Sequence, residues 1–202
     1  MCGIISEMAK VNSNKNLIKD LMTIGRKIES CGLVIGDGGN ISARCGDIMY
    51  IKKKGASLAS QKQADYIPIS IKTGKPLRRN GEPSTEIHMH LACYKARKDI
   101  GAVVHTHPVF ITALGIAAVG LERVSYEAKV HLKRGIVSLP YIKPGSRELG
   151  KAVGGAIARH NLVVLKRHGL LTVGKDIKEA FLRTLAAERA AMVYVYSKKA
   201  KA

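Results

Sequence analysis

The sequence predicts a single α/β domain over residues 1–202, with a central, mainly antiparallel β-sheet flanked by helices. Two long segments, 13–31 and 177–196, repeat apolar residues every three to four positions, as amphipathic helices do. Between them, short apolar runs are separated by turns rich in glycine and proline, which is typical of short strands and hairpins. Helices mixed with many short strands indicate one α/β domain, and 202 residues suffice for a compact core.

The first half of the chain alternates short strands with turns. The first helix is expected to end near Gly32, before a glycine-rich turn at 34–40. Strands are predicted at 41–43, 48–51 and 66–71, with turns at 46–47 and 73–76. We expect Ser84 to cap a helix that carries Glu86, His88, His90 and Tyr94.

In the second half, two apolar strands each lead into histidines. The pattern predicts strands at 102–104, 136–139 and 162–165, helices at 109–116, 148–159 and 177–196, and turns at 144–146 and 173–174. The first of these strands ends in His105 and His107, and 162–165 leads to His168.

The chain is strongly basic, with a formal net charge of +19. Such a field attracts anions and could bind nucleic acid without specificity. The lysines and arginines are spread along the chain, however, and aromatic residues make up only 4% of it. Attraction of an anionic substrate therefore explains the charge more economically than dedicated nucleic-acid binding. We expect the basic tail at 197–202 to be flexible.

The cysteines and the N-terminal segment indicate a cytoplasmic protein. No C-x-x-C pair occurs among Cys2, Cys31, Cys45 and Cys93, so free thiols in a reducing compartment are expected. No clean signal peptide and no apolar run long enough to cross a bilayer are found. The start, Met1-Cys2-Gly3-Ile4, is similar to that of amidotransferases with an N-terminal cysteine nucleophile, but nothing downstream supports that function.

Three histidines form a candidate metal site. His105 and His107 are two residues apart at the end of a strand, so both side chains face the same side. His168 follows the second apolar strand in a similar setting. Three neutral imidazoles leave one open position on tetrahedral zinc, which is the catalytic pattern, although cobalt, manganese or iron suit the same ligands. The alternative is a set of surface or hydrogen-bonded histidines.

The residues resemble those of the class II aldolase/adducin family, and within it the L-fuculose-1-phosphate aldolases. Five motifs carry the resemblance from about Gly32 to the final helix: Gly38-Gly39-Asn40-Ile41-Ser42, Pro83-Ser84-Thr85-Glu86, Val104-His105-Thr106-His107, Tyr141 with Gly145-Ser146, and His168-Gly169-Leu170. The resemblance implies a central antiparallel sheet flanked by helices. It also implies a homotetramer with active sites near subunit interfaces.

The resemblance also implies a reaction. A zinc ion held by His105, His107 and His168 would act as a Lewis acid in the reversible cleavage of a ketose 1-phosphate into dihydroxyacetone phosphate and an aldehyde. Glu86 matches the family's acid/base glutamate. Tyr126, expected on a strand, matches the tyrosine that donates a proton to the aldehyde oxygen.

The resemblance further assigns a phosphate cradle and leaves other residues open. Gly39, Asn40, Gly55, Ser84 and Thr85 would hold the phosphate with amides and hydroxyls. Against the family pattern, Asp37 replaces a hydroxyl residue and Lys52-Lys53-Lys54 replaces Thr-Pro-Thr, which puts the identity of the substrate in question. The two histidines of the 84–94 segment, His88 and His90, are expected on a helix face.

Alternatives within the family remain. A methylthioribulose-1-phosphate dehydratase would use a glutamate near Glu127, whereas a ribulose-5-phosphate 4-epimerase would carry aspartate in place of Glu86. An adducin-like interaction module would lack the metal histidines, all of which this chain has.

Overall fold

A seven-stranded sheet forms the centre of the molecule. The computed structural model describes residues 2–78, 81–115 and 120–200, with side chains from residue 14 onward. The sheet has the strand order β3-β2-β1-β4-β7-β6-β5, and every neighbouring pair is antiparallel except β5 and β6. The strands are β1 (Asn40–Cys45), β2 (Ile48–Lys52), β3 (Tyr66–Ser70), β4 (Ala102–Thr106), β5 (Ile136–Leu139), β6 (Leu162–Leu165) and β7 (Gly169–Gly174). The predicted α/β fold with a mainly antiparallel sheet is therefore confirmed.

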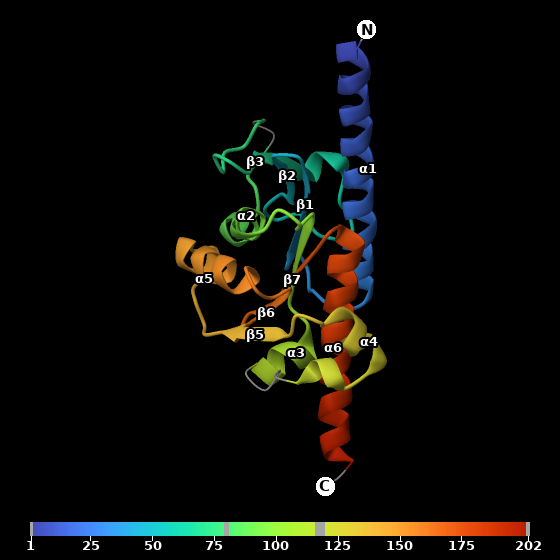
Figure 1. The fold of residues 1–202 in the computed structure, drawn as a ribbon, viewed down its shortest axis with the longest axis vertical. Coiled ribbons are helices and arrows are strands. Elements are labelled where there is room, and N and C mark those ends of the chain that lie inside the picture. The colour runs from blue at the N-terminus through green and yellow to red at the C-terminus, as the bar shows by residue number, and fades with distance from the viewer. Residues whose placement is uncertain (1, 79–80, 116–119, 201–202) are drawn as a thin grey trace.

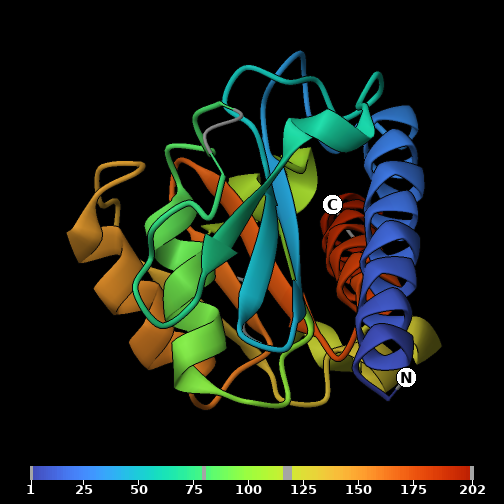
Figure 2. The same cartoon turned by 90° about the horizontal axis from the view of Figure 1, so that it is seen from above.

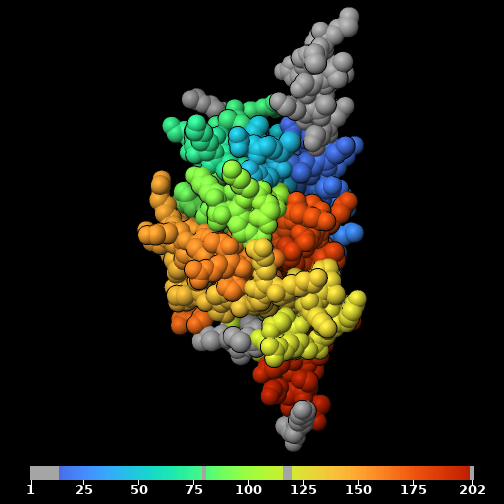
Figure 3. Space-filling view, viewed as in Figure 1, coloured from blue at the N-terminus to red at the C-terminus, as the bar shows by residue number. Residues whose placement is uncertain are grey.

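Helices cover both faces of this sheet. The helices are α1 (Cys2–Ser30), α2 (Ile87–Ala96), α3 (Val109–Leu114), α4 (Tyr126–His131), α5 (Arg147–Ile157) and α6 (Ile177–Lys199), with 3-10 turns η1 (Gln63–Asp65) and η3 (Leu121–Arg123). Figures 1 and 2 show α2 and α5 side by side on one face, with α1 and α6 on the other. In the space-filling view the last turns of α6 project beyond the body of the domain (Figure 3).

Alternation along the strands divides the core between these two faces. In β4, Val103 packs into the cluster of α2 and α5, whereas Val104 packs into the cluster of α1 and α6. In β1, Ile41 and Ala43 belong to the cluster of α1 and α6. Because side chains alternate, Asn40 and Ser42 of the same strand point toward α2. The polar residues of β1 therefore lie on the face that carries Glu86.

One predicted turn is a strand. The sequence predicts a turn at Val173-Gly174, but both residues belong to β7, which pairs with β4 and β6. Gly174 serves close packing, because a Cβ there would lie 2.5 Å from the amide nitrogen of Ala180 in α6. The glycine was therefore misinterpreted as a turn signal.

Other boundaries shift by smaller amounts. The first helix begins at Cys2 and not at residue 13, and the predicted 109–116 helix ends at Leu114, with 116–119 outside the described residues. Tyr126 begins α4 and does not lie on a strand, because Ser125 caps that helix by accepting the amide hydrogen of Ala128. Helix α6 continues through Lys199 into the segment expected as a tail. No helix in the described part of the chain is long and apolar enough to span a membrane.

We expect Leu171→Ala to destabilise the fold by about 2–5 kcal/mol, because it leaves a cavity in a central strand. Leu171 is fully buried in β7, whereas Leu182 of α6 is 44% exposed and offers the matched control Leu182→Ala. Denaturant unfolding monitored by circular dichroism measures both. Equal midpoints for the two variants would contradict the central placement of β7.

Candidate metal centre

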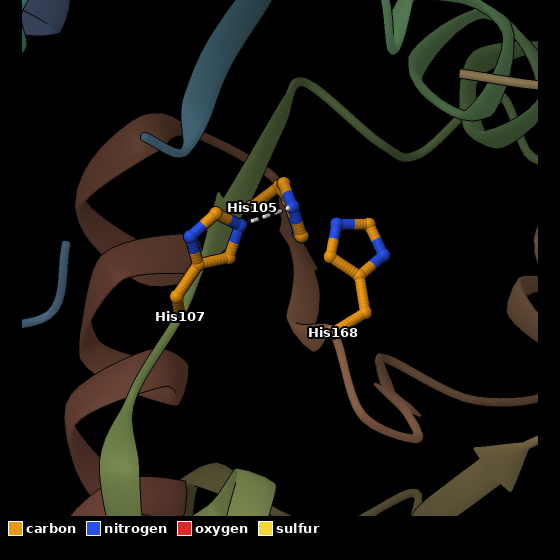
Figure 4. A group of neighbouring side chains, drawn as sticks. All are labelled: His105, His107 and His168. Carbon is orange, nitrogen blue, oxygen red and sulfur yellow. Dashed lines mark hydrogen bonds between the residues drawn. The ribbon is translucent and has the colours of Figure 1, made fainter. Parts of the chain in front are cut away.

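Strand pairing brings the three histidines together. Strand β4 ends with His105 and Thr106, which pair with Leu171 and Leu170 of β7. His168 precedes β7, so antiparallel pairing places it beside the end of β4. His107 lies directly after β4, where its amide donates to the carbonyl of Leu33. Figure 4 shows the three rings turned toward a common space.

The ring nitrogens are close enough to share one ion. One ring nitrogen from each histidine can be chosen so that all lie within 4.8 Å of one another. The Nε2 atoms of His105 and His107 are 3.1 Å apart. Two ligands of a tetrahedral zinc ion, each about 2.0–2.1 Å from it, are separated by roughly 3.3 Å. The pair already has the spacing of one edge of that tetrahedron.

Glycines let the backbone approach this cluster. A Cβ on Gly169 would lie 2.3 Å from the carbonyl oxygen of Thr106, and one on Gly39 would lie 2.8 Å from that of His105. Gly39 also has a φ of 65°, which favours glycine. Arg167, at φ 58°, is the residue other than glycine with positive φ in the described part of the chain, and it directly precedes His168. The turn into β7 is thus strained where it delivers the third ligand.

Glu86 completes the cluster from the other side. The side chain is 7% exposed, and its Oε2 lies 2.9 Å from Nε2 of His105. Its Oε1 lies 3.4 Å from Nε2 of His168 and is a buried atom without a hydrogen-bond partner. The Nδ2 of Asn40 donates to Oε2 at 3.0 Å. Glu86 occupies the N-cap position of α2, so Ser84 is not the cap and instead accepts the Glu86 amide hydrogen at 3.3 Å.

Electrostatics keep the carboxylate ionised and two imidazoles neutral. Burial raises the pKa of Glu86, but the charge and hydrogen bond of His105, with smaller contributions from Asn40 and His168, bring it well below its usual value. Partial burial, with the charge of His105 next, lowers the pKa of His107 and of His168 to about 4 each. At neutral pH both rings present lone pairs, as metal ligands must.

A cation between these groups fits their chemistry. Nδ1 of His105 lies 3.1 Å from the carbonyl of Leu170, so a neutral ring donates there and leaves a lone pair on Nε2. That lone pair would face the Glu86 carboxylate at 2.9 Å, which is repulsive unless a proton or a metal ion lies beside both. The buried Oε1 of Glu86 has no hydrogen-bond partner, so it too would be stabilised by a nearby proton or metal ion. His105, His107 and His168 therefore fit a divalent ion.

Comparison with known proteins identifies the family. The Class II Aldolase and Adducin N-terminal domain family matches residues 19–195. The chain belongs to this family. An L-fuculose phosphate aldolase of Methanococcus maripaludis is 35% identical over 176 residues, covering 87% of this chain and 94% of the relative.

Two further comparisons bear on fold and reaction. A solved L-fuculose 1-phosphate aldolase has a TM-score of 0.83 and 27% identity, covering 91% of this chain and 87% of the other. A methylthioribulose-1-phosphate dehydratase of Acidiphilium cryptum is 31% identical over 181 residues, covering 84% of this chain and 85% of the relative. This class II aldolase homologue is therefore an enzyme, and its relatives act on sugar phosphates.

A buried lysine lies between the loops that carry several of the predicted phosphate residues of this class II aldolase. Lys52 is 2% exposed, and its Nζ donates to the carbonyls of Asp37 and Ala56 at 2.6 Å each. It thereby joins the loop of Gly39 to the loop of Gly55. Its own carbonyl accepts from the amide of Ser84 at 2.9 Å. Burial lowers the pKa of Lys52, against the raising effect of Asp37 and Glu86.

Four residues singled out in the sequence have surroundings that sequence patterns did not reveal. The Asn40 side chain is 4% exposed and bonded to Glu86 and His90, so its amide is already engaged. Thr85 is exposed, with Gly145 packed against its carbonyl. His90 is fully buried and does not lie on an open helix face, since it hydrogen-bonds to β1. His88 is half-buried and packs against Gly150 of α5.

Tyr126 and Glu127 lie on α4, which contributes no residue to the histidine cluster in the described part of the chain. Tyr126 is 79% exposed at the start of α4, a helix packed on α6. Glu127 is exposed, and its pKa is lowered by the backbone and hydroxyl donors at the helix start. In the described part of the chain the metal-binding geometry comprises only His105, His107 and His168.

Removing one ligand should remove the ion. His168→Ala leaves two imidazoles, so zinc affinity should fall by more than about 100-fold, beyond what loss of an outer partner costs. His131→Ala in α4 is the control, because that histidine lies outside the cluster. Zinc per chain after dialysis, measured by mass spectrometry, should be near one for wild type and control. Full retention by His168→Ala would refute the assignment.

Proposed function

We propose that the chain is a zinc-dependent aldolase that reversibly cleaves a ketose 1-phosphate, L-fuculose 1-phosphate or a related sugar, into dihydroxyacetone phosphate and an aldehyde. The observation that carries this proposal is the placement of Glu86. A buried carboxylate with one oxygen free of hydrogen bonds lies against two of the three imidazoles of the metal centre. A proton acceptor beside a Lewis acid is what proton removal next to a carbonyl requires.

The roles divide between the ion and the protein. Bound by His105, His107 and His168, zinc would polarise the substrate carbonyl. In the condensation direction, Oε1 of Glu86 removes a proton from the hydroxymethyl carbon of dihydroxyacetone phosphate. That carbon then forms the bond to the aldehyde, whose oxygen receives a proton from Tyr126. Cleavage reverses each transfer, so Glu86 returns the proton to the same carbon.

The phosphate would be held by the two loops that Lys52 joins. We assign this role to the backbone of Gly39, Asn40 and Gly55 and to the hydroxyls of Ser84 and Thr85, because backbone amides and hydroxyls are anion donors. Lys52 supports the assignment because its buried ammonium provides positive charge between the loops. The charge of the Asp37 carboxylate acts to raise the pKa of Lys52, so the two opposite charges offset each other in this region.

The second candidate is a methylthioribulose-1-phosphate dehydratase, favoured by the Acidiphilium cryptum relative. The aldolase is preferred because Glu86 lies on the histidines, where proton removal next to the carbonyl requires a base, whereas Glu127, beside Tyr126 on α4, has no role in that reaction. A 4-epimerase is disfavoured by glutamate at position 86, and an adducin-like module by the three histidines.

We further propose a cytoplasmic homotetramer with active sites between subunits. The exposure of Tyr126 supports this arrangement, because a residue 79% exposed in one chain is free to reach the site of a neighbour. Symmetric assembly would then place one such tyrosine at each metal centre.

Glu86→Gln should abolish turnover while zinc stays bound. The amide keeps the shape of the carboxylate but cannot accept the proton, so kcat should fall by at least about 100-fold. The assay incubates zinc-loaded protein with L-fuculose 1-phosphate and related ketose 1-phosphates, and couples released dihydroxyacetone phosphate to NADH oxidation. Glu82→Gln is the matched control, since Glu82 is exposed in the same segment and pairs with Lys54.

Two outcomes of this assay would overturn the proposal. Release by Glu86→Gln at the wild-type rate would remove Glu86 from the chemistry. No release by wild type, with one zinc ion per chain, would refute the aldolase function and favour the dehydratase or epimerase.

Co-expression of Tyr126→Phe with Glu86→Gln should restore activity that neither variant has alone. If each site takes Glu86 from one subunit and Tyr126 from another, random assembly of equal amounts makes about one quarter of the sites complete. The recovered activity should therefore approach a quarter of wild type. Wild-type activity of Tyr126→Phe alone would contradict the role of the tyrosine.

A further inference from the structure

Five buried side chains form one hydrogen-bonded chain that ends at Glu86. Asn40 Nδ2 donates to Glu86 Oε2 at 3.0 Å, and Asn40 Oδ1 lies 2.5 Å from His90 Nε2. His90 Nδ1 lies 2.7 Å from Ser42 Oγ, which lies 2.8 Å from the hydroxyl of Tyr94. Each of the five is at most 7% exposed. The metal centre and the phosphate loops do not account for His90, Ser42 and Tyr94.

The chain is built from two matching periodicities. Asn40 and Ser42 are two residues apart on β1 and share one face of the strand. Glu86, His90 and Tyr94 are four residues apart at the start and along α2, and share one face of the helix. Contacts alternate between strand and helix, so each partner is held from two sides.

Chemistry at the Glu86 end fixes the direction of every bond. A carboxylate only accepts, so Asn40 must turn its NH2 group toward Glu86 and its carbonyl toward His90. His90 therefore carries its proton on Nε2 and accepts at Nδ1 from the hydroxyl of Ser42. Because Ser42 donates its only hydroxyl hydrogen to His90, it accepts a hydrogen bond from the hydroxyl of Tyr94. In each of the four bonds the donor is therefore on the Tyr94 side and the acceptor is on the Glu86 side.

The neutral form of His90 is supported by its surroundings. Complete burial, with the charge of His105 next, lowers the pKa of His90 to about 3. Burial likewise raises the pKa of the Tyr94 hydroxyl. Both ring nitrogens of His90 are engaged, so the ring is locked in one tautomer and one orientation. It holds its neighbours in place and does not carry protons to the substrate.

We propose that His90 is a positioning residue. Its Nε2–H tautomer fixes the orientation of the Asn40 amide, so that the NH2 group restrains Oε2 of Glu86 and Oε1 remains free to accept the substrate proton. This inference rests on the proposed function. Without a donor at position 90, Asn40 can rotate by half a turn and present its carbonyl to the carboxylate. Repulsion would then move Glu86 from its place beside the histidines, and small displacements of a reacting group reduce turnover strongly.

Two substitutions at position 90 separate hydrogen bonding from packing. His90→Leu keeps an apolar body but removes both hydrogen bonds, whereas His90→Gln keeps an NH2 donor toward Asn40. Thr184→Val in α6 is the matched control. Thr184 is also fully buried and its hydroxyl bonds with Thr172, but it belongs to no part of the site.

We expect His90→Leu to lower kcat of the zinc-loaded enzyme by about 10- to 100-fold, with KM changed less than about threefold and zinc content unchanged. His90→Gln should recover kcat to within about fivefold of wild type. Thr184→Val should lower the unfolding midpoint without lowering kcat. Equal kcat for the Leu and Gln variants would overturn the proposal, and so would loss of zinc from His90→Leu.

A second readout does not depend on activity. The ring ¹⁵N shifts of His90, assigned by their loss in His90→Gln, report which nitrogen carries the proton. The proposal requires protonated Nε2 and bare Nδ1 in the zinc-loaded protein at neutral pH. A proton on Nδ1 would overturn it. Inactive wild-type enzyme with the Nε2–H tautomer would instead refute the proposed function alone, because the network would be intact.

Discussion

The antiparallel pairing of β4 with β7 determines where every group of the metal centre lies. Pairing Thr106 with Leu170 places the end of one strand beside the start of the other. His168 therefore meets His105 and His107, although 60 residues lie between His107 and His168 in the sequence. The same pairing lets Nδ1 of His105 reach the carbonyl of Leu170, which exposes Nε2 to an ion. Close approach of the strands depends on Gly169, because any side chain there would meet the backbone of Thr106.

Because of this pairing, several polar side chains lie buried close to one another. Glu86, Asn40, His90 and His105 are all buried, and burying such groups is costly unless each has a partner. The chain from Tyr94 to Asn40 satisfies Oε2 of Glu86, which also lies against His105, and Oε1 lies against His168. A cation held by the three histidines would satisfy the remaining lone pairs of the imidazoles and of the carboxylate together. Structure and metal affinity are therefore coupled.

Sequence patterns predicted the parts of the site that follow simple periodicity. His105 and His107 share a strand face by their spacing of two, and the apolar runs before the histidines predicted two of the central strands. The same patterns failed where tertiary contacts decide. The sequence predicts a turn at Gly174 because the close approach of α6 is invisible in it, and it does not reveal that Ser125 caps a helix beginning at Tyr126.

The hydrogen-bonded chain shows the same limit. Its signal was present, as Asn40 and Ser42 are two apart while Glu86, His90 and Tyr94 are four apart. Only the packing of α2 on β1 reveals that these two series interlock. Likewise, the sequence marked Lys52-Lys53-Lys54 as a departure from the family pattern but did not reveal that Lys52, the last residue of β2, is buried between two loops.

Anomalous diffraction from crystals of the zinc-loaded protein would locate the ion directly. We expect a single strong zinc peak about 2.0–2.1 Å from one ring nitrogen of each of His105, His107 and His168. We also expect Glu86 to lie beside this ion, with Oε2 still bound by Asn40. A peak at any other site, or an ion held by fewer than these three histidines, would contradict the assignment of the metal centre.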